Sequence, residues 1–403
     1  MLDLNKVSQQ LAGTIDHLRE EATAARKRME RAETLFLQAC QQQDALVKAQ
    51  KRWRDRIWFS AATPVEPLDT RVLLKAPPKA HSVIATDGSQ IAPNQHEIAY
   101  CYLLNIGRVA LHYGQNRQPL LDSIPEVFYR PEDLYVSRQW GIRTEEWMGY
   151  RRTVAEATEL AELAVSVRLQ NRKPPMLAMV DGSLIYWFLE NLPNEAIDRI
   201  LPPMLEAWNR LQLAGVPLLG YLSASRSSEA LHFLRFQACP FDVPNCSTNC
   251  PYVAPEEGEV VLKRSPCQVA EPLRDTIFWA TQLQPGERGC LWKSSNPILN
   301  LYGDRQTVYF CYVHVGSEIA RIDLPAWVAN NPDLLDTALS LMLGQVYKGY
   351  GYPVTLAEAH NQAVVRGGDR HRFFALLERQ MIEAGLQNVG TSYKEARKRR
   401  SIA

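Results

Sequence analysis

The sequence predicts an α/β fold in which helices flank a mixed sheet. Two observations support this prediction. Apolar segments rich in β-branched and aromatic residues follow one another closely between residues 81 and 113, as in strands joined by short turns. From residue 147 onward, helical segments alternate with short apolar segments, which is typical of strands that lie parallel in one sheet.

The N-terminal region predicts helix. Residues 3 to about 58 contain no Pro and no Gly after Gly13, and apolar residues recur at three- and four-residue spacing, as in one long or two consecutive amphipathic helices. These helices could pack on their own domain or form an arm that binds a second copy or a partner. We therefore expect a helical arm over 1–62, a main domain over 63–393 and a basic tail over 394–403.

The remaining elements are expected from hydrophobic periodicity. A first strand covers 81–86 and ends at Asp87, and a β-hairpin covers 97–113 with its turn at Gly107 and Arg108. Later strands are expected at 176–180, 216–222 and 305–315, and helices at 147–168, 184–189, 194–214, 334–347, 356–365 and 372–385.

Composition argues against several classes of protein. The 45 Lys and Arg nearly balance the 44 Asp and Glu, so any contact with nucleic acid must come from local basic patches. We expect a cytoplasmic protein with no membrane span, because the N-terminus does not resemble a signal peptide and no apolar run is long enough to cross a bilayer. A G-x-x-x-x-G-K-[ST] segment does not occur, which argues against a P-loop ATPase.

The tripeptide Asp-Gly-Ser occurs twice, at 87–89 and 181–183, each time after an apolar strand. An Asp at the carboxyl end of a strand points into the crevice where α/β sheets bind ligands, Gly lets the chain turn and approach a phosphate, and Ser can cap the next element. Either copy alone would more often be a simple turn. Two copies favour chemistry, with Asp87 and Asp181 as ligands of Mg²⁺ or Mn²⁺.

A metal site for phosphodiester hydrolysis usually needs a third carboxylate. The helix expected at 147–168 offers Glu156, Glu159 and Glu162. Glu156 lies at the margin of the helix's apolar stripe, whereas Glu159 points most nearly away from it. We therefore choose Glu156 and keep Glu159 in reserve; the alternative for each of the three is an exposed helix face.

The chain resembles the NurA nuclease family through short motifs that occur in the family's order. They span roughly residues 80 to 370 and include both Asp-Gly-Ser tripeptides. The other motifs lie at 152–156, 179–184, 220–226, 285–288, 309–313, 321–325, 351–353 and 359–360. The resemblance implies an RNase H-like core, Mn²⁺- or Mg²⁺-dependent cleavage of DNA ends, and a toroidal homodimer that resects double-strand breaks with the hexameric translocase HerA.

The resemblance also assigns roles to single residues. It implies that Asp87, Asp181 and Glu156 bind the metal. His360 resembles the family's late histidine, which could bind metal or transfer protons. A lone histidine on a helix is more often structural. The motif around His360 makes a functional role as plausible as a structural one.

Four further residues within the motifs are candidates for contacts with DNA. Arg226 and Arg321 could bind phosphate, because a guanidinium group matches a phosphate with two hydrogen bonds, or they could form internal salt bridges. Tyr312 and Tyr352 could line the site or stack on bases, and a place in the core is equally compatible with the sequence.

An insertion at 239–267 departs from the minimal family pattern. It contains Cys239, Cys246, Cys250 and Cys267 with the spacing C-x6-C-x3-C-x16-C. Four thiols in a reducing compartment could bind Zn²⁺ or an iron–sulfur cluster, although tight C-x-x-C pairs are missing. Free cysteines and a redox-labile pair are the alternatives.

Two other functions are compatible with the sequence. One is a related RNase H-like nuclease that acts on RNA or on Holliday junctions, because a carboxylate cluster does not report which nucleic acid is cut. The other is a non-catalytic scaffold in DNA repair, in which the N-terminal helices and the basic tail bind partners.

Overall fold

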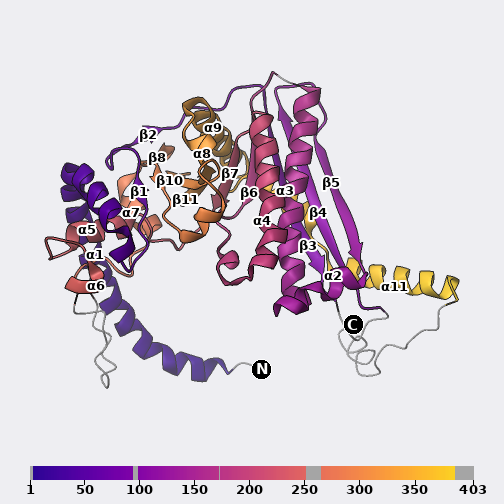
Figure 1. The fold of residues 1–403 in the computed structure, drawn as a ribbon, viewed down its shortest axis with the longest axis horizontal. Helices are drawn as coiled ribbons and strands as arrows, with labels where there is room; N and C mark the ends of the chain where they lie inside the picture. Colours follow the sequence, from indigo (N-terminus) through magenta and orange to yellow (C-terminus); the bar gives the residue numbers. More distant parts are fainter. Residues whose placement is uncertain (1–2, 94–98, 172, 251–264, 386–403) are drawn as a thin grey trace. The chain divides into compact units, whose positions relative to one another are not determined.

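The computed structural model describes residues 3–93, 99–171, 173–250 and 265–385 (Figure 1). The expected basic tail therefore lies outside the described residues. Within the described ranges, no helix combines the length and the apolar character needed to cross a bilayer. The chain divides into unit 1 (Met1–Leu74, Leu222–Leu299 and Thr307–Asp323) and unit 2 (Lys75–Tyr221, Asn300–Gln306 and Leu324–Ala403), and each is described by itself.

Unit 1 begins with helix α1 (Leu4–Trp53), a single helix where the sequence allowed one or two. In the second half of α1, Ala32, Phe36 and Ala39 are buried in the hydrophobic core of the unit. In its first half, apolar side chains such as Leu11 are exposed. The second half of the helix therefore packs on its own unit, and the first half leaves apolar residues in contact with solvent.

The other elements of unit 1 are short. Its strands follow the order β1-β9-β10-β11, and β8 pairs with both β10 and β2. The sequence does not predict β11, because Arg321 and Asp323 interrupt its apolar pattern; both side chains are buried, and their ion pair is 2.8 Å long. The helices are η1 (Arg54–Arg56), η4 (Leu231–Phe233), α5 (Leu234–Ala238), α6 (Cys246–Asn249), α7 (Asp275–Gln282) and η5 (Pro297–Leu301). The strands are β1 (Thr63–Pro64), β2 (Val72–Leu73), β8 (Glu287–Arg288), β9 (Trp292–Lys293), β10 (Val308–His314) and β11 (Ile319–Pro325).

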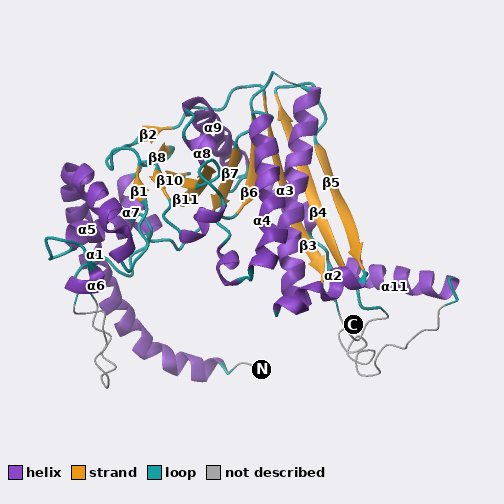
Figure 2. Ribbon diagram, in the orientation of Figure 1, coloured by secondary structure: helices purple, strands orange, loops and turns teal. Residues whose placement is uncertain are grey.

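Unit 2 contains a mixed sheet in the order β7-β6-β3-β4-β5 (Figure 2). β3, β4 and β5 are antiparallel neighbours, whereas β6 pairs in parallel with both β3 and β7. This is the RNase H-like arrangement, in which an antiparallel meander continues into parallel strands. The strands are β3 (His81–Ile91), β4 (Tyr102–Tyr113), β5 (Leu120–Phe128), β6 (Met176–Asp181) and β7 (Leu218–Leu222).

Helices cover both faces of the unit 2 sheet. α3 and α4 lie side by side over one face (Figure 1). Position 88 of β3 faces α3, whereas the neighbouring position 87 and its partner 107 on β4 face α10, so α10 covers the opposite face. The helices are α2 (Pro131–Tyr135), η2 (Val136–Trp140), α3 (Thr144–Gln170), η3 (Trp187–Asn191), α4 (Asn194–Leu213), α8 (Ala326–Ala329), α9 (Pro332–Lys348), α10 (Val354–Ala363) and α11 (Gly367–Glu383).

The antiparallel strands extend beyond their expected ends. The predictions that the first strand ends at Asp87 and that the chain turns at Gly107 are both wrong. β3 continues to Ile91, and Gly107 lies within the uninterrupted strand β4, between Asp87 of β3 and Ser123 of β5. Because the glycine has a strand in register on each side, ladder hydrogen bonds keep it extended. The first two residues of the expected hairpin lie outside the described residues.

The parallel strands and the long helices lie where the sequence predicts them, with ends shifted by a few residues. The helix expected at 184–189 is wrong, because only the short 3-10 turn η3 forms in this region. The Tyr302 hydroxyl accepts a hydrogen bond from Tyr186 N–H (2.9 Å) and donates one to the Leu184 carbonyl oxygen (3.2 Å). Tyr302 therefore takes the hydrogen bonds of Tyr186 N–H and of the Leu184 carbonyl, which in a helix would each bond to a backbone group four residues away.

Gly107 lets helix α10 lie directly against strand β4. A Cβ atom at this position would be 2.5 Å from Ala359 O and 2.5 Å from Ala363 N, which are backbone atoms of α10. On the same face of the strand, Asn105 Nδ2 donates a hydrogen bond to Ala363 O (2.8 Å). The helix is thus held against the sheet by a contact that only glycine permits and by a side-chain hydrogen bond.

We predict that Gly107→Ala lowers the stability of the protein by about 1–3 kcal/mol, because the added methyl group collides with the backbone of α10. Gly149→Ala, in helix α3, is the matched control, since its Cβ position has no heavy atom within 4 Å and alanine favours helix. Thermal unfolding followed by circular dichroism compares the three proteins. Equal melting temperatures for Gly107→Ala and the parent chain would contradict the close approach.

Candidate active site

Asp87 and Asp181 lie on neighbouring parallel strands of unit 2. In the pairing of β3 with β6, Ala85 is opposite Met179, and each aspartate comes two residues later along its strand. Because side chains two residues apart on a strand share a face, the two carboxylates are carried to neighbouring positions on the same face of the sheet. They are close enough to interact, because the charge of Asp87 raises the pKa of Asp181.

The Asp181 carboxyl has contacts that oppose one another. The residue as a whole is exposed, but nearby protein atoms remove part of the water around its carboxyl, and this raises its pKa. A hydrogen bond from Tyr352 and the nearby His360 act in the opposite direction. The Tyr352 ring packs edge-on against Tyr221, with ring centroids 5.6 Å apart. Tyr352 thus has its hydroxyl at the site and its ring against the sheet.

His360, on helix α10, contacts Asp87 directly. Its Nδ1 atom is 2.9 Å from Asp87 Oδ2, and 66% of the histidine side chain is exposed. The helix end that follows His360 is attached to β3, because Ser89 Oγ donates to the Ala363 carbonyl oxygen and accepts from Val365 N–H (3.1 Å). Ser89, expected to cap the next element along the chain, instead lies within strand β3 and fixes α10.

Glu156 reaches the aspartates from the opposite face of the sheet, through the position of Gly88. A Cβ atom at Gly88 would collide with Glu156 Oε1 and would lie 2.6 Å from Cγ of Arg152. Gly88 N–H donates to Asp87 Oδ1 (2.8 Å) and also to the Glu156 carboxylate. Thr86 Oγ1 donates a hydrogen bond to the Glu156 carbonyl oxygen (2.8 Å), and this bond holds α3 against β3 next to Gly88. The missing side chain of Gly88 therefore brings a carboxylate from α3 to Asp87.

The pKa of the Glu156 carboxyl is well above that of an ordinary glutamate. Although 23% of the side chain remains exposed, burial by surrounding protein atoms raises its pKa to about 7, and the charges of Asp87 and Asp181 add to this rise. The Nε atom of Arg152, 3.2 Å from Glu156 Oε1, opposes it. Three carboxylates that repel one another in this way would be stabilised by a bound cation.

The model of the NurA domain family matches residues 81–365, a range that contains Asp87, Glu156, Asp181 and His360. The chain belongs to the NurA family. The resemblance inferred from its motifs is thereby confirmed. The chain matches no curated protein sequence.

One solved structure similar to this NurA chain supports its fold. The crystal structure of the NurA nuclease from Sulfolobus solfataricus covers 95% of this chain and 98% of that chain, with 12% sequence identity and a TM-score of 0.50. RuvC from T. thermophilus, in complex with a Holliday junction substrate, covers 38% of this chain and 76% of that chain at 15% identity. The TM-score of this match is 0.16.

The other two candidate glutamates of this NurA chain form ion pairs elsewhere on α3. Glu159 Oε2 is 3.3 Å from Arg108 Nη1, and Glu162 Oε1 is 3.5 Å from Arg210 Nη1. Glu156 is thus the member of the three whose carboxylate interacts with both aspartates.

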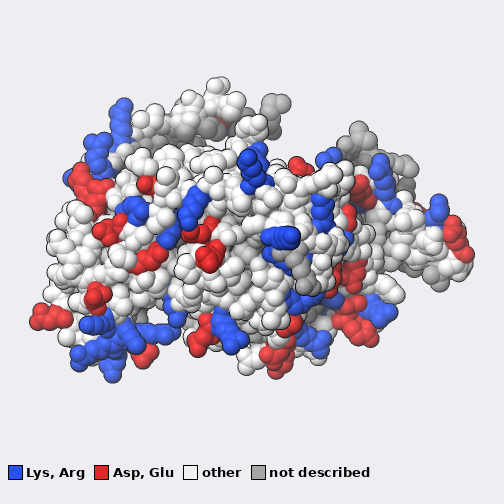
Figure 3. Space-filling model, turned by 90° about the horizontal axis from the view of Figure 1, so that it is seen from above, with Lys and Arg blue, Asp and Glu red and all other residues white. Residues whose placement is uncertain are grey.

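Three of the residues considered for DNA contact lie in unit 1. Arg226 is exposed. Arg321 is buried, 2.8 Å from Asp323 and 3.3 Å from Glu229, and the hydroxyl of the buried Tyr312 donates to Asp275 Oδ2 (2.7 Å). Arg321 and Tyr312 thus occupy the interior positions that the sequence left open for them. In the view of Figure 3, basic and acidic side chains are interspersed on the surface.

Sequence reasoning missed the residues that support the site. Ser89 and Asn105 anchor α10, and Arg152 pairs with Glu156. Only Arg152 leaves a signal in the sequence, because it stands four residues before Glu156 on a predicted helix. The contacts of Ser89 and Asn105 join residues far apart in the chain, and no local pattern reports them.

The donor set fits a hard divalent cation. Carboxylate oxygens of Asp87, Glu156 and Asp181 are ligands that Mg²⁺ and Mn²⁺ prefer, and their mutual repulsion calls for positive charge. Among the described residues, no three His, Cys, Asp or Glu side chains already form a metal-binding group. Binding would therefore require these side chains to draw closer together.

We predict that Glu156→Gln stabilises the metal-free protein above neutral pH. A raised carboxyl pKa means that the glutamate's contribution to stability is present below its unfolded pKa, near 4.5, and is lost as pH rises through its folded value of about 7. The parent chain should therefore lose melting temperature relative to Glu156→Gln between pH 5 and pH 8.

The measurement is thermal unfolding in the presence of a chelator, at several pH values across that window. Glu162→Gln, which removes an exposed carboxylate from the same helix, is the matched control and should follow the parent chain. A constant difference between Glu156→Gln and the parent chain at every pH would contradict the prediction.

Proposed function

We propose that this NurA chain is a divalent-metal-dependent nuclease that hydrolyses phosphodiester bonds at DNA ends. The observation that carries the proposal is the convergence of four side chains from four different elements beside strands β3 and β6 of unit 2. They are Asp87, Glu156, Asp181 and His360. Burial and neighbouring negative charge raise the pKa values of the Glu156 and Asp181 carboxyls, and groups perturbed in this way cluster at functional sites.

Asp87, Asp181 and Glu156 would hold Mn²⁺ or Mg²⁺. When bound, such a cation supplies a hydroxide nucleophile at neutral pH and stabilises the leaving oxygen. His360 has a separate task in the proposal. In the tautomer that carries its proton on Nδ1 and donates it to Asp87, the Nε2 atom of this exposed side chain would be able to exchange protons with water or the leaving group.

Two side chains would orient the carboxylates. Tyr352 donates a hydrogen bond to Asp181, which restricts the rotation of that carboxylate. Arg152 pairs with Glu156, and at 35% exposure its guanidinium can also face a phosphate. The exposed Arg226 is a further candidate for contact with the DNA backbone.

The family membership supports a wider proposal about assembly. We infer that the chain acts as a homodimer in the cytoplasm, in double-strand break repair, together with a hexameric HerA-type ATPase. The sequence contains no P-loop of its own, so translocation along DNA would depend on such a partner. We further propose that residues 63–393 act as the nuclease domain and 1–62 as its helical arm.

Asp87→Asn and Asp181→Asn should each lower cleavage by roughly 100-fold or more while leaving the protein folded, because each removes a charged oxygen ligand without emptying the core. Asp122→Asn is the matched control; this half-buried aspartate of β5 pairs with Arg108 outside the site, and the variant should keep full activity. Cleavage of linear double-stranded DNA, single-stranded DNA and RNA is measured with Mn²⁺ and with a chelator.

The same assay separates the alternatives. Full activity of both variants would indicate a non-catalytic scaffold with a contaminating nuclease. Cleavage of RNA alone, or of four-way junctions alone, would replace the proposed substrate. Cleavage that persists in the presence of the chelator would contradict the proposed dependence on a divalent metal.

Gly88→Ala should also reduce cleavage by at least about tenfold, although glycine carries no reactive group. Its methyl group would displace Glu156 and Arg152, and misplacing a catalytic group by about 1 Å can cost up to 100-fold in rate. Gly368→Ala, where a Cβ atom meets no atom within 4 Å, serves as the control. Unchanged activity together with unchanged Mn²⁺ affinity would show that Glu156 can reach the site even when residue 88 has a side chain.

A further inference from the structure

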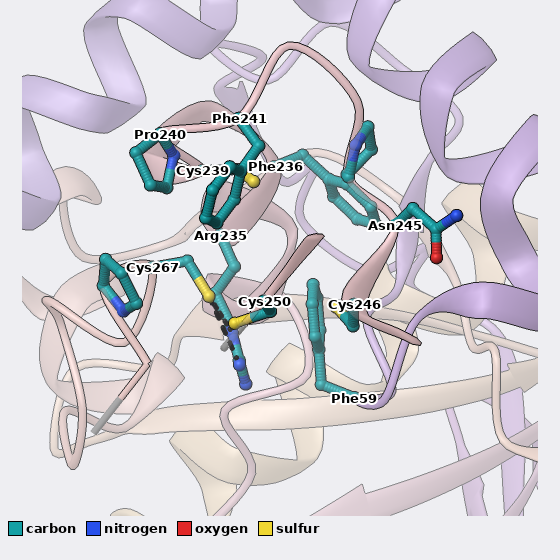
Figure 4. A pocket seen from close by; sticks show the side chains of 12 residues that line it. Phe59, Arg235, Phe236, Cys239, Pro240, Phe241, Asn245, Cys246, Cys250 and Cys267 are labelled. Carbon is teal, nitrogen blue, oxygen red and sulfur yellow. Dashed lines mark hydrogen bonds between the residues drawn. The ribbon is translucent and has the colours of Figure 1, made fainter. Parts of the chain in front are cut away.

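Four cysteines of unit 1 line one cavity, at a distance in sequence from the carboxylate site. Cys239 follows helix α5, Cys246 begins the short helix α6, Cys250 follows that helix, and Cys267 lies in a later loop (Figure 4). Aromatic rings and prolines form the rest of the cavity wall, including Phe59 and Phe236. Three separate pieces of chain therefore bring their thiols to one apolar cavity.

The thiols interact with one another but form no disulfide. All four are free cysteines. Burial raises the pKa of the Cys239 thiol, and charges on Cys267, Cys246 and Cys250 would raise it further, so each of these three thiols lies within electrostatic range of Cys239. A group of this kind is costly as four thiolates unless a cation compensates the charge.

Arg235 already supplies part of that compensation. Its Nε and Nη2 atoms each donate a hydrogen bond to Cys267 Sγ, both 3.4 Å long (Figure 4). Its Nη1 atom donates to Glu271 Oε1 (3.1 Å), and its guanidinium lies 3.8 Å from the centroid of the Phe59 ring. The guanidinium thus places two N–H groups and a positive charge beside one sulfur atom of the cavity. Metal-binding sulfur atoms commonly have such outer hydrogen bonds.

We propose that Cys239, Cys246, Cys250 and Cys267 bind one Zn²⁺ ion as a structural site. Zinc with four cysteine ligands is a closed tetrahedral site that needs no open position for chemistry. The Cys246-x3-Cys250 pair lies within the C-x2–4-C spacing that zinc sites use. Iron–sulfur runs rely on C-x2-C pairs, which these four cysteines do not contain.

Zinc binding requires a local change in the thiols. The described residues contain no ready-made group of three metal ligands, so the cysteine side chains must turn toward a common centre. Rotation about χ1 between staggered positions moves a sulfur atom without moving the backbone. The excess negative charge of four thiolates around one dication falls beside Arg235. The site would join the insertion to α5 and to the segment that carries Phe59.

The proposal is tested on the full-length protein purified without chelators. Elemental analysis should find about one zinc per chain. Cys246→Ser and Cys250→Ser should each lose most of this zinc, whereas Cys40→Ser, at a free cysteine of helix α1, should retain it. Asp87→Asn should retain it too, which separates this site from the proposed nuclease centre.

A second measurement does not depend on the folding of any variant. The parent chain, stripped of metal and loaded with Co²⁺, should show the intense sulfur-to-metal charge-transfer bands and the visible bands of a tetrahedral thiolate site. No metal in the purified protein together with no Co²⁺–thiolate bands would overturn the proposal. Iron with inorganic sulfide in place of zinc would overturn it as well.

Discussion

The candidate site depends on the absence of a side chain at Gly88. Helices α3 and α10 lie on opposite faces of the sheet, and side chains from opposite faces ordinarily do not meet across a strand. Here the Glu156 carboxylate lies where the first carbon of a side chain would be, and the Gly88 N–H donates to both Glu156 and Asp87. One backbone group thus links carboxylates that the sheet would otherwise separate. Burial at this position raises the pKa of Glu156, and the charges of Asp87 and Asp181 add to the rise.

The same principle positions α10. Gly107 is the neighbour of Asp87 across the strands, and its missing side chain lets the helix lie on the sheet, while Ser89 and Asn105 both hydrogen-bond to the Ala363 carbonyl oxygen. His360 then meets Asp87 at hydrogen-bonding distance. Two glycines on adjacent strands thus admit one helix from each side, and the carboxylate cluster forms between them.

Part of this arrangement could be predicted from the sequence. The two Asp-Gly-Ser tripeptides pointed to Asp87 and Asp181, although only the second tripeptide comes at the end of a strand and the first lies within β3. The margin of the helix's apolar stripe pointed to Glu156. The end of β3 and the continuity of β4 could not be predicted, since Gly107 is a common turn residue and only its partners on both sides keep it extended. The interior places of Arg321 and Tyr312 depend on Asp323, Glu229 and Asp275, two of which are distant in sequence.

The central claim is that Asp87, Glu156 and Asp181 share a cation. The most direct measurement is anomalous diffraction from a crystal of the protein soaked in Mn²⁺, with data collected at the manganese absorption edge. We expect an anomalous peak within bonding distance of oxygen atoms from all three side chains. A well-ordered crystal in which these carboxylates have no such peak, or in which the metal binds elsewhere, would contradict it.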